Sequence, residues 1–122
     1  MARNYLLTYS EQLATEIELL CQKIKAPFNT TFQIRKSSSS VYANIREANY
    51  GQSKADMLSK FEIALKECNE TEGWLQLLLN TNTISDSTYK QQRNLCGRIR
   101  RLLISSCKTL KTAKNRDEDK ND

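Results

Sequence analysis

Histidine is absent from this chain of 122 residues, proline occurs once and glycine three times. The lack of histidine excludes a mixed cysteine–histidine zinc site, a histidine general base and the Glu-x-x-His pairs of di-metal helical bundles. The scarcity of glycine and proline leaves few of the turn residues that a β-rich fold needs. These absences favour long helices and predict a protein that is not an enzyme and uses no cofactor or metal.

Long hydrophobic runs are also missing. No apolar stretch approaches the roughly 20 residues needed to cross a bilayer, and Glu11 interrupts the short apolar start at Leu6 and Leu7, where an export signal would continue. We therefore expect a cytoplasmic protein with no membrane role. With 39% hydrophobic residues, the chain predicts a single domain with a modest core.

The cysteines are widely spaced and never form a Cys-x-x-Cys pair. Each lies on or near an apolar helical stripe, which favours free buried thiols over disulfides or an all-cysteine metal site. They are Cys21, Cys68, Cys96 and Cys107.

Apolar residues recur at steps of three and four along four segments, the spacing of helices that pack along their length. The first covers about residues 6–24 and ends before Pro27. The second follows a predicted cap at Thr30 or Thr31 and stops near residues 49–51.

The third segment has the broadest apolar face and begins at Ser53, with Asp56 in the position that completes a capping box. A polar turn at residues 80–83 separates it from the fourth segment, which Ser85 or Asp86 caps. The simplest fold for this order is all-α, an up-down-up-down antiparallel four-helix bundle. We expect one domain over residues 1–114 and a disordered charged tail over residues 115–122.

Four consecutive serines, residues 37–40, lie inside the apolar pattern of the second segment. We interpret them as helical, with small side chains that let a neighbouring helix approach closely. Polar residues near them and on the third helix predict a structural hydrogen-bond network in which Arg35 neutralises a partly buried carboxylate. Its members are Arg35, Asn44, Glu47 and Glu72.

Several runs at matching spacing between residues 33 and 79 resemble the small bacterial four-helix-bundle proteins named after the intervening sequences of 23S ribosomal RNA genes. The runs are Gln33–Arg35, Ser40–Ala48, Ser53–Asp56, Lys60–Glu67 and Glu72–Leu78. The resemblance implies a homo-oligomeric ring of five without known catalysis. A related group, the accessory proteins of diversity-generating retroelements, implies RNA or DNA and a reverse transcriptase or another protein as partners. Many relatives have Ala and Gly where this chain has Arg46 and Ala48.

Acidic residues are missing from residues 89–116, which contain nine basic side chains. Residues 1–88 have a net charge of −1 and residues 117–122 a net charge of −3, so this segment makes the chain basic. Arrays of lysine and arginine bind phosphate chains by releasing counterions. The segment predicts a surface for RNA or DNA, whose candidate residues are Lys90, Arg93, Arg98, Arg100, Arg101, Lys108 and Lys111.

Two alternatives to nucleic-acid binding remain for this basic face. It is either a hydrated surface that maintains solubility or a contact for an acidic protein partner in a scaffold. A face that only maintains solubility normally carries charges of both signs. The absence of acidic residues from this segment therefore favours polyanion binding. Ile104, an apolar residue within the basic arc, suggests a contact with a neighbouring subunit.

Aromatic residues that could stack on bases are spread over different predicted helices. We interpret Tyr42, Tyr50, Trp74 and Tyr89 as packing or subunit-interface residues. The sequence therefore predicts binding to the nucleic-acid backbone with little sequence preference.

Overall fold

The computed structural model describes residues 4–51 and 53–120, with side chains described as far as residue 113. Within these residues the chain forms four helices and no strand, which confirms the predicted all-α fold. The helices are α1 (Tyr5–Lys23), α2 (Phe28–Ala48), α3 (Lys54–Asn80) and α4 (Asp86–Lys120).

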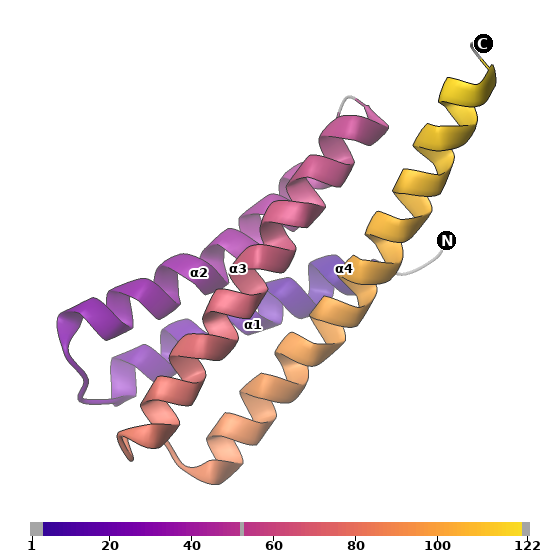
Figure 1. Ribbon diagram of the computed structural model, residues 1–122. Coiled ribbons are helices and arrows are strands. Elements are labelled where there is room, and N and C mark those ends of the chain that lie inside the picture. The colour runs from indigo at the N-terminus through magenta and orange to yellow at the C-terminus, as the bar shows by residue number, and fades with distance from the viewer. Residues whose placement is uncertain (1–3, 52, 121–122) are drawn as a thin grey trace.

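Each helix packs against two others. α1 contacts α2 and α4, and α3 contacts the same two helices from the opposite side. Successive helices run in opposite directions, so the chain forms the predicted up-down-up-down bundle (Figure 1). The contact between α1 and α4 is the least extensive of the four. The last turns of α4 extend past the ends of the other helices (Figure 1).

The helix starts follow local capping chemistry. The Asn4 side chain accepts a hydrogen bond from the Leu7 amide at 3.0 Å, the Ser53 hydroxyl accepts one from the Asp56 amide at 3.1 Å, and the Ser85 hydroxyl accepts one from the Thr88 amide at 3.1 Å. Each bond satisfies an amide that has no partner within its own helix. The predicted caps of the third and fourth helices are confirmed.

Two boundaries differ from the sequence-based expectation. α2 begins at Phe28 rather than after Thr30 or Thr31, because Pro27, with φ −56°, is its cap residue. Both threonines instead lie buried in the first turn, where the amide of each donates to the Pro27 carbonyl. α4 is helical to Lys120, within the segment assigned to a disordered tail, and residues 121–122 lie outside the described residues.

The core is contributed by all four helices. Its fully buried aliphatic side chains include Leu13, Ile17, Ile34, Ile45, Leu75, Leu78, Ile99 and Leu103. All four cysteines are buried and free, as predicted. Burial raises the pKa of the Cys21 and Cys107 thiols above its usual value.

The serine run is helical and lies where α2 meets α3. Ser37 and Ser38 are each only 1% exposed. The Thr71 hydroxyl on α3 donates a hydrogen bond to the Ser37 hydroxyl at 2.8 Å, which satisfies two polar groups in the core. The small side chains therefore allow the close approach between helices that the sequence predicted.

Candidate nucleic-acid interface

The basic side chains lie along the outer face of α4. Arg100 is partly exposed, and the other six candidates, Lys90, Arg93, Arg98, Arg101, Lys108 and Lys111, are exposed. Ile104 lies among them with 48% of its surface exposed. The helix thus exposes basic side chains along its length, and their role in binding stays a prediction.

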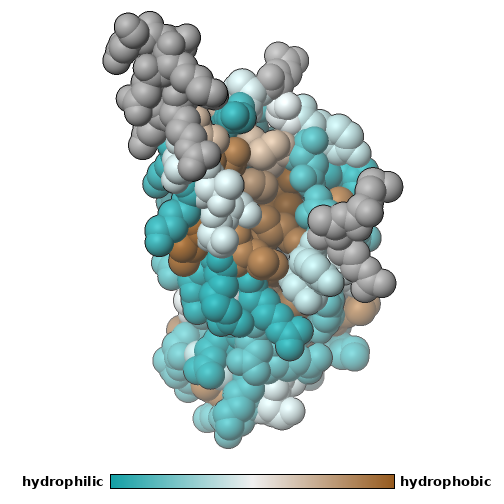
Figure 2. Space-filling model, turned by 90° about the vertical axis from the view of Figure 1, so that its right-hand side faces the viewer, coloured by the Kyte–Doolittle hydropathy of each residue, from teal (hydrophilic) through white to brown (hydrophobic). Residues whose placement is uncertain are grey.

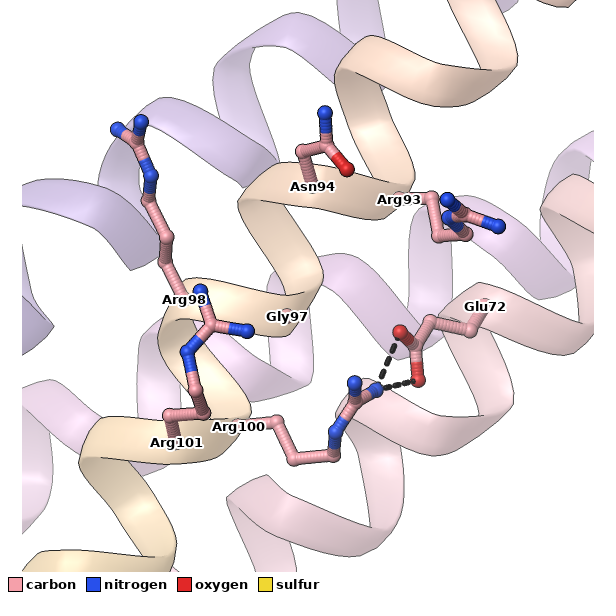
Figure 3. A pocket seen from close by; sticks show the side chains of 7 residues that line it. All are labelled: Glu72, Arg93, Asn94, Gly97, Arg98, Arg100 and Arg101. Atoms are coloured by element: carbon pink, nitrogen blue, oxygen red, sulfur yellow. Dashed lines mark hydrogen bonds and ion pairs between the residues drawn. The ribbon is translucent and has the colours of Figure 1, made fainter.

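Four arginines of this face line one cleft of about 500 Å³, which we call the arginine cleft (Figure 3). It is lined by Arg93, Asn94, Gly97, Arg98, Arg100 and Arg101 of α4 and by Glu72 of α3. The remaining three candidates, Lys90, Lys108 and Lys111, do not line it. The structure therefore concentrates the arginines and leaves the lysines along the rest of the helix.

Arg100 is held by a carboxylate. Its Nη1 atom donates hydrogen bonds to both side-chain oxygens of Glu72 (Figure 3). This contact raises the pKa of Arg100 further above its already high value. Because its charge is compensated within the protein, Arg100 joins α4 to α3 and contributes less to anion attraction than its neighbours.

The other three arginines of the cleft have no carboxylate partner within ion-pair distance among the described residues. Two of them lie against aromatic rings: the guanidinium carbon of Arg93 is 5.6 Å from the centre of the Tyr89 ring, and that of Arg98 is 5.9 Å from the centre of the Tyr9 ring. Such contacts orient a guanidinium without neutralising it. Arg93 and Arg98 are therefore oriented by aromatic rings, and all three arginines keep an uncompensated positive charge at the cleft.

Gly97 lies at the centre of the cleft. A Cβ atom there would lie 3.3 Å from Arg101 Nη1 and 3.7 Å from Arg100 Nη2. Arg101 lies across this position, between Arg98 on one side and Arg100 on the other (Figure 3). The missing side chain allows guanidinium groups to gather close to the helix backbone. The sequence signal was a single glycine inside a basic helical segment, which periodicity analysis overlooks.

A pair of tyrosines on α1 was also missed from the sequence. Tyr5 and Tyr9 stack with ring centres 5.8 Å apart. Together with Arg98, Arg101 and Leu102 they line an open groove of about 260 Å³, which we call the tyrosine groove. The available signal was the spacing of four between the two tyrosines, which places them on one helix face.

Of the aromatic residues singled out from the sequence, Tyr89 lies beside Arg93 of the arginine cleft, and none of the four lines the tyrosine groove. Trp74 lines an open groove with Gln33, Glu70, Gly73 and Leu77. The Tyr42 hydroxyl accepts a hydrogen bond from Arg46 at 3.0 Å. The Tyr89 hydroxyl donates to the Gln76 side chain at 2.7 Å, and Tyr50 is exposed.

The predicted polar network is not formed, because its four members lie on different faces and each has its own partner. Arg35 pairs with Glu18 of α1 at 2.7 Å rather than with Glu72, and this lowers the pKa of Glu18. The Asn44 amide donates to the Ser40 carbonyl at 2.9 Å, and Glu47 pairs with Lys60 at 3.2 Å. Of the four, only Glu72 belongs to the arginine cleft.

Among the described residues, no group of three or more cysteine, aspartate or glutamate side chains is placed to hold a metal ion. Over the same residues, none of the helices is long and apolar enough to cross a membrane.

The fold and the cleft define a small antiparallel four-helix-bundle protein with a basic last helix. Residues 6–105 match the family model of the 23S rRNA-intervening sequence proteins, and the chain belongs to this family. The resemblance inferred from residues 33–79 is therefore confirmed and covers all four helices.

A solved structure supports the same assignment. The chain is 41% identical to a protein of unknown function from the S23 ribosomal protein family of Bacteroides thetaiotaomicron, with a TM-score of 0.79. The similarity covers 84% of this chain and 98% of that one. No curated protein matches the chain.

Proposed function

We propose that this protein binds the phosphate backbone of RNA or DNA through the basic face of α4, without catalysing a reaction. The single observation that carries this proposal is the arginine cleft, which Arg93, Arg98 and Arg101 line without a carboxylate partner among the described residues. Positive charges that line one cleft repel one another, and a bound phosphate chain relieves the repulsion. Exposed Lys90, Lys108 and Lys111 extend the basic track along the helix.

Binding of this kind reads charge rather than base sequence. Guanidinium groups match the geometry of phosphate oxygens and donate hydrogen bonds to two of them at once. Contacts with phosphates position a nucleic acid and carry no sequence information themselves. We therefore expect affinity to depend steeply on salt and weakly on sequence.

We further propose that the protein forms a homo-oligomer, a pentamer if it follows the ring that the family resemblance implies. Large apolar side chains remain exposed on all four helices, including Leu19, Phe32, Ile63, Leu77 and Ile104. Burial of such surface drives association between subunits. A ring would repeat the arginine cleft on each subunit, so that individually weak contacts act together.

A scaffold for protein partners is the second candidate function, and one observation favours it. Phe28 and Phe32 stack at the start of α2 with ring centres 5.8 Å apart, and Phe28 is 80% exposed. α2 is not a neighbour of α4, so this aromatic pair is a surface separate from the arginine cleft. It suits an apolar contact with another subunit or with a protein such as a reverse transcriptase.

The test is the binding of fluorescent single- and double-stranded RNA and DNA across a salt series. We compare the native protein with an Arg93→Glu/Arg101→Glu variant, which leaves Arg100 and its partner Glu72 intact. The matched control is Lys25→Glu/Lys36→Glu, an equal change in charge at two exposed positions outside α4. Light scattering on each protein gives the oligomeric state.

The cleft variant is expected to lose affinity and to reduce the slope of log affinity against log salt by about 1.4–1.8, the value for two lost phosphate contacts. The control is expected to keep most of the native affinity and slope. Equal losses of affinity in the two variants would show a general effect of charge and contradict a role for the cleft. Failure of the native protein to bind any of these ligands near physiological salt would overturn the proposal and leave the scaffold as the remaining candidate function.

A further inference from the structure

The tyrosine groove lies directly beside the arginine cleft. Arg98 and Arg101 line both depressions, so the two adjoin on α4, the cleft extending to Glu72 of α3 and the groove to Tyr5 and Tyr9 of α1. The cleft is lined by charged and polar groups, whereas the groove adds two tyrosine rings and Leu102. Figure 2, which looks onto the side of the molecule that carries α4, shows apolar surface gathered in its upper half and mostly hydrophilic surface below.

Tyr5 is placed to receive a further ring. It is 48% exposed, and one neighbour within its helix, Tyr9, already stacks on it at an interplanar angle of 23°. Tyr9 in turn supports the guanidinium of Arg98. The ring of Tyr5 is thus held in place by packing while much of its surface remains open, an arrangement that lowers the entropic cost of stacking.

We propose that the tyrosine groove makes this protein selective for single-stranded nucleic acid: an unpaired base stacks on Tyr5 while Arg98 and Arg101 hold the adjoining phosphates. This inference rests on the proposed function, and it deepens that function by naming the strand state of the ligand. The charge of the two arginines favours a polyanion over a second, basic copy of this chain as the occupant of the groove.

The selectivity follows from where the bases lie in each ligand. In a duplex the bases are stacked within the helix and a protein meets mainly phosphates and groove edges, whereas in a single strand the faces of the bases are free. Every base has such a face, so stacking selects single strands without selecting a sequence. Both strand states would use the arginine cleft, and only the single strand would use Tyr5.

The experiment measures the affinity of the full chain for an unstructured single-stranded oligonucleotide, for the duplex of the same sequence, and for an abasic strand of the same length. The variants are Tyr5→Ala, which removes the ring, and Tyr5→Phe, which keeps it. The matched control is Tyr50→Ala, which removes a ring that is 78% exposed at the end of α2. Circular dichroism checks the fold of each variant, and light scattering checks its oligomeric state.

Loss of one stacked base is expected to lower the single-strand affinity of Tyr5→Ala by at least roughly fivefold. Its duplex and abasic-strand affinities and its salt slope should change by less than twofold, and Tyr5→Phe and Tyr50→Ala should resemble the native protein. Native protein should bind the abasic strand more weakly than the strand with bases.

Three results would overturn this inference and leave the proposed function in place. In the first two, Tyr5→Ala lowers the affinities for single strand and duplex equally, or lowers neither. In the third, Tyr5→Ala changes the oligomeric mass while the preference for single strands stays intact. The last result would assign the groove to a subunit contact. Failure of the native protein to bind any of the three ligands would instead overturn the proposed function, and the inference with it.

Discussion

Arg100 and Glu72 form the ion pair that joins α4 to α3, with one guanidinium nitrogen donating to both carboxylate oxygens. Among the residues that the structure describes, Glu72 is the only acidic one that lines the arginine cleft. The pair therefore has two opposing effects, because it links two helices and also places a negative charge beside the guanidinium groups proposed to bind phosphate.

Replacement of Glu72 by glutamine should separate these effects. The free energy of unfolding is expected to fall by about 0.5–1 kcal/mol, since the Arg100 side chain is 40% exposed and water screens the pair. Polyanion affinity is expected to rise about two- to fivefold, because a carboxylate leaves the cleft and Arg100 is released. Urea unfolding and salt-matched binding measure the two quantities. Glu70→Gln, the same change outside the cleft, is the control, and a lower affinity for Glu72→Gln would contradict the prediction.

Enlarging a buried serine should disrupt the contact between α2 and α3. Ser37→Leu is expected to lower the free energy of unfolding by at least about 2 kcal/mol, because the new side chain overpacks the interface and removes one of the two acceptors of the Thr71 hydroxyl. Ser39→Leu makes the same change at an exposed position of the same run and should stay within about 0.5 kcal/mol of the native value. If urea unfolding shows the same loss of stability for Ser37→Leu and Ser39→Leu, the assignment of Ser37 to the core is contradicted.

Gly73 offers a stabilising substitution. It lies within α3, is exposed, and a Cβ atom there would meet nothing within 4 Å. Gly73→Ala is expected to raise the free energy of unfolding by up to about 1 kcal/mol through higher helix propensity and a less flexible unfolded chain. A loss of stability would show that another subunit approaches this surface closely. Gly97→Ala should gain less, because Arg101 must shift to admit the new methyl group.

The buried thiols should make the protein less stable at alkaline pH. Hydrogen bonding with Cys68 and burial raise the pKa of Cys96 far above its ordinary value. The pKa of this thiol is higher in the folded chain than in the unfolded chain, where it is about 8.5. The stability of the fold is therefore unaffected below about pH 8.5 and decreases as the pH rises beyond that value. At pH 9.5 this effect is expected to cost about 1.4 kcal/mol for a thiol that stays protonated only in the folded state.

Urea unfolding at pH 7.5 and pH 9.5, for the native protein and for Cys96→Ala, measures this effect. The variant should be less stable at pH 7.5, because a buried side chain has been shortened, but should lose less stability between the two values. The same loss in both proteins would assign the alkaline effect to tyrosine and lysine side chains instead.

The sequence predicted the fold well because each helix carries its own periodicity and its own stop and start residues. Ser53 and Ser85 act as caps where the pattern placed them. The start of α2 was placed too late because two threonines resemble caps, whereas the fixed φ of Pro27 begins the helix earlier. Helix caps and starts of this kind depend on neighbouring residues, so they can be predicted from one segment of the sequence at a time.

The site was predictable only in part, because its geometry depends on contacts between helices. The basic face of α4 followed from the period of one helix. The pairing of Arg100 with Glu72 depends on the register of α4 against α3, and the position of Tyr5 depends on which helix lies beside α4. Neither relation is encoded in the spacing of a single segment, so the sequence paired Glu72 with Arg35 and overlooked Tyr5.

The up-down-up-down order places the start of α1 and the end of α4 at the same end of the bundle, and these two helices are neighbours (Figure 1). A linker could therefore join the two ends, and the chain could be reopened at the Thr81–Ser85 turn as a circular permutant in which α4 comes first. Every helix pair and both sides of the α1–α4 surface would be retained in such a protein. The order of the helices along the chain is thus separable from the surface that they build.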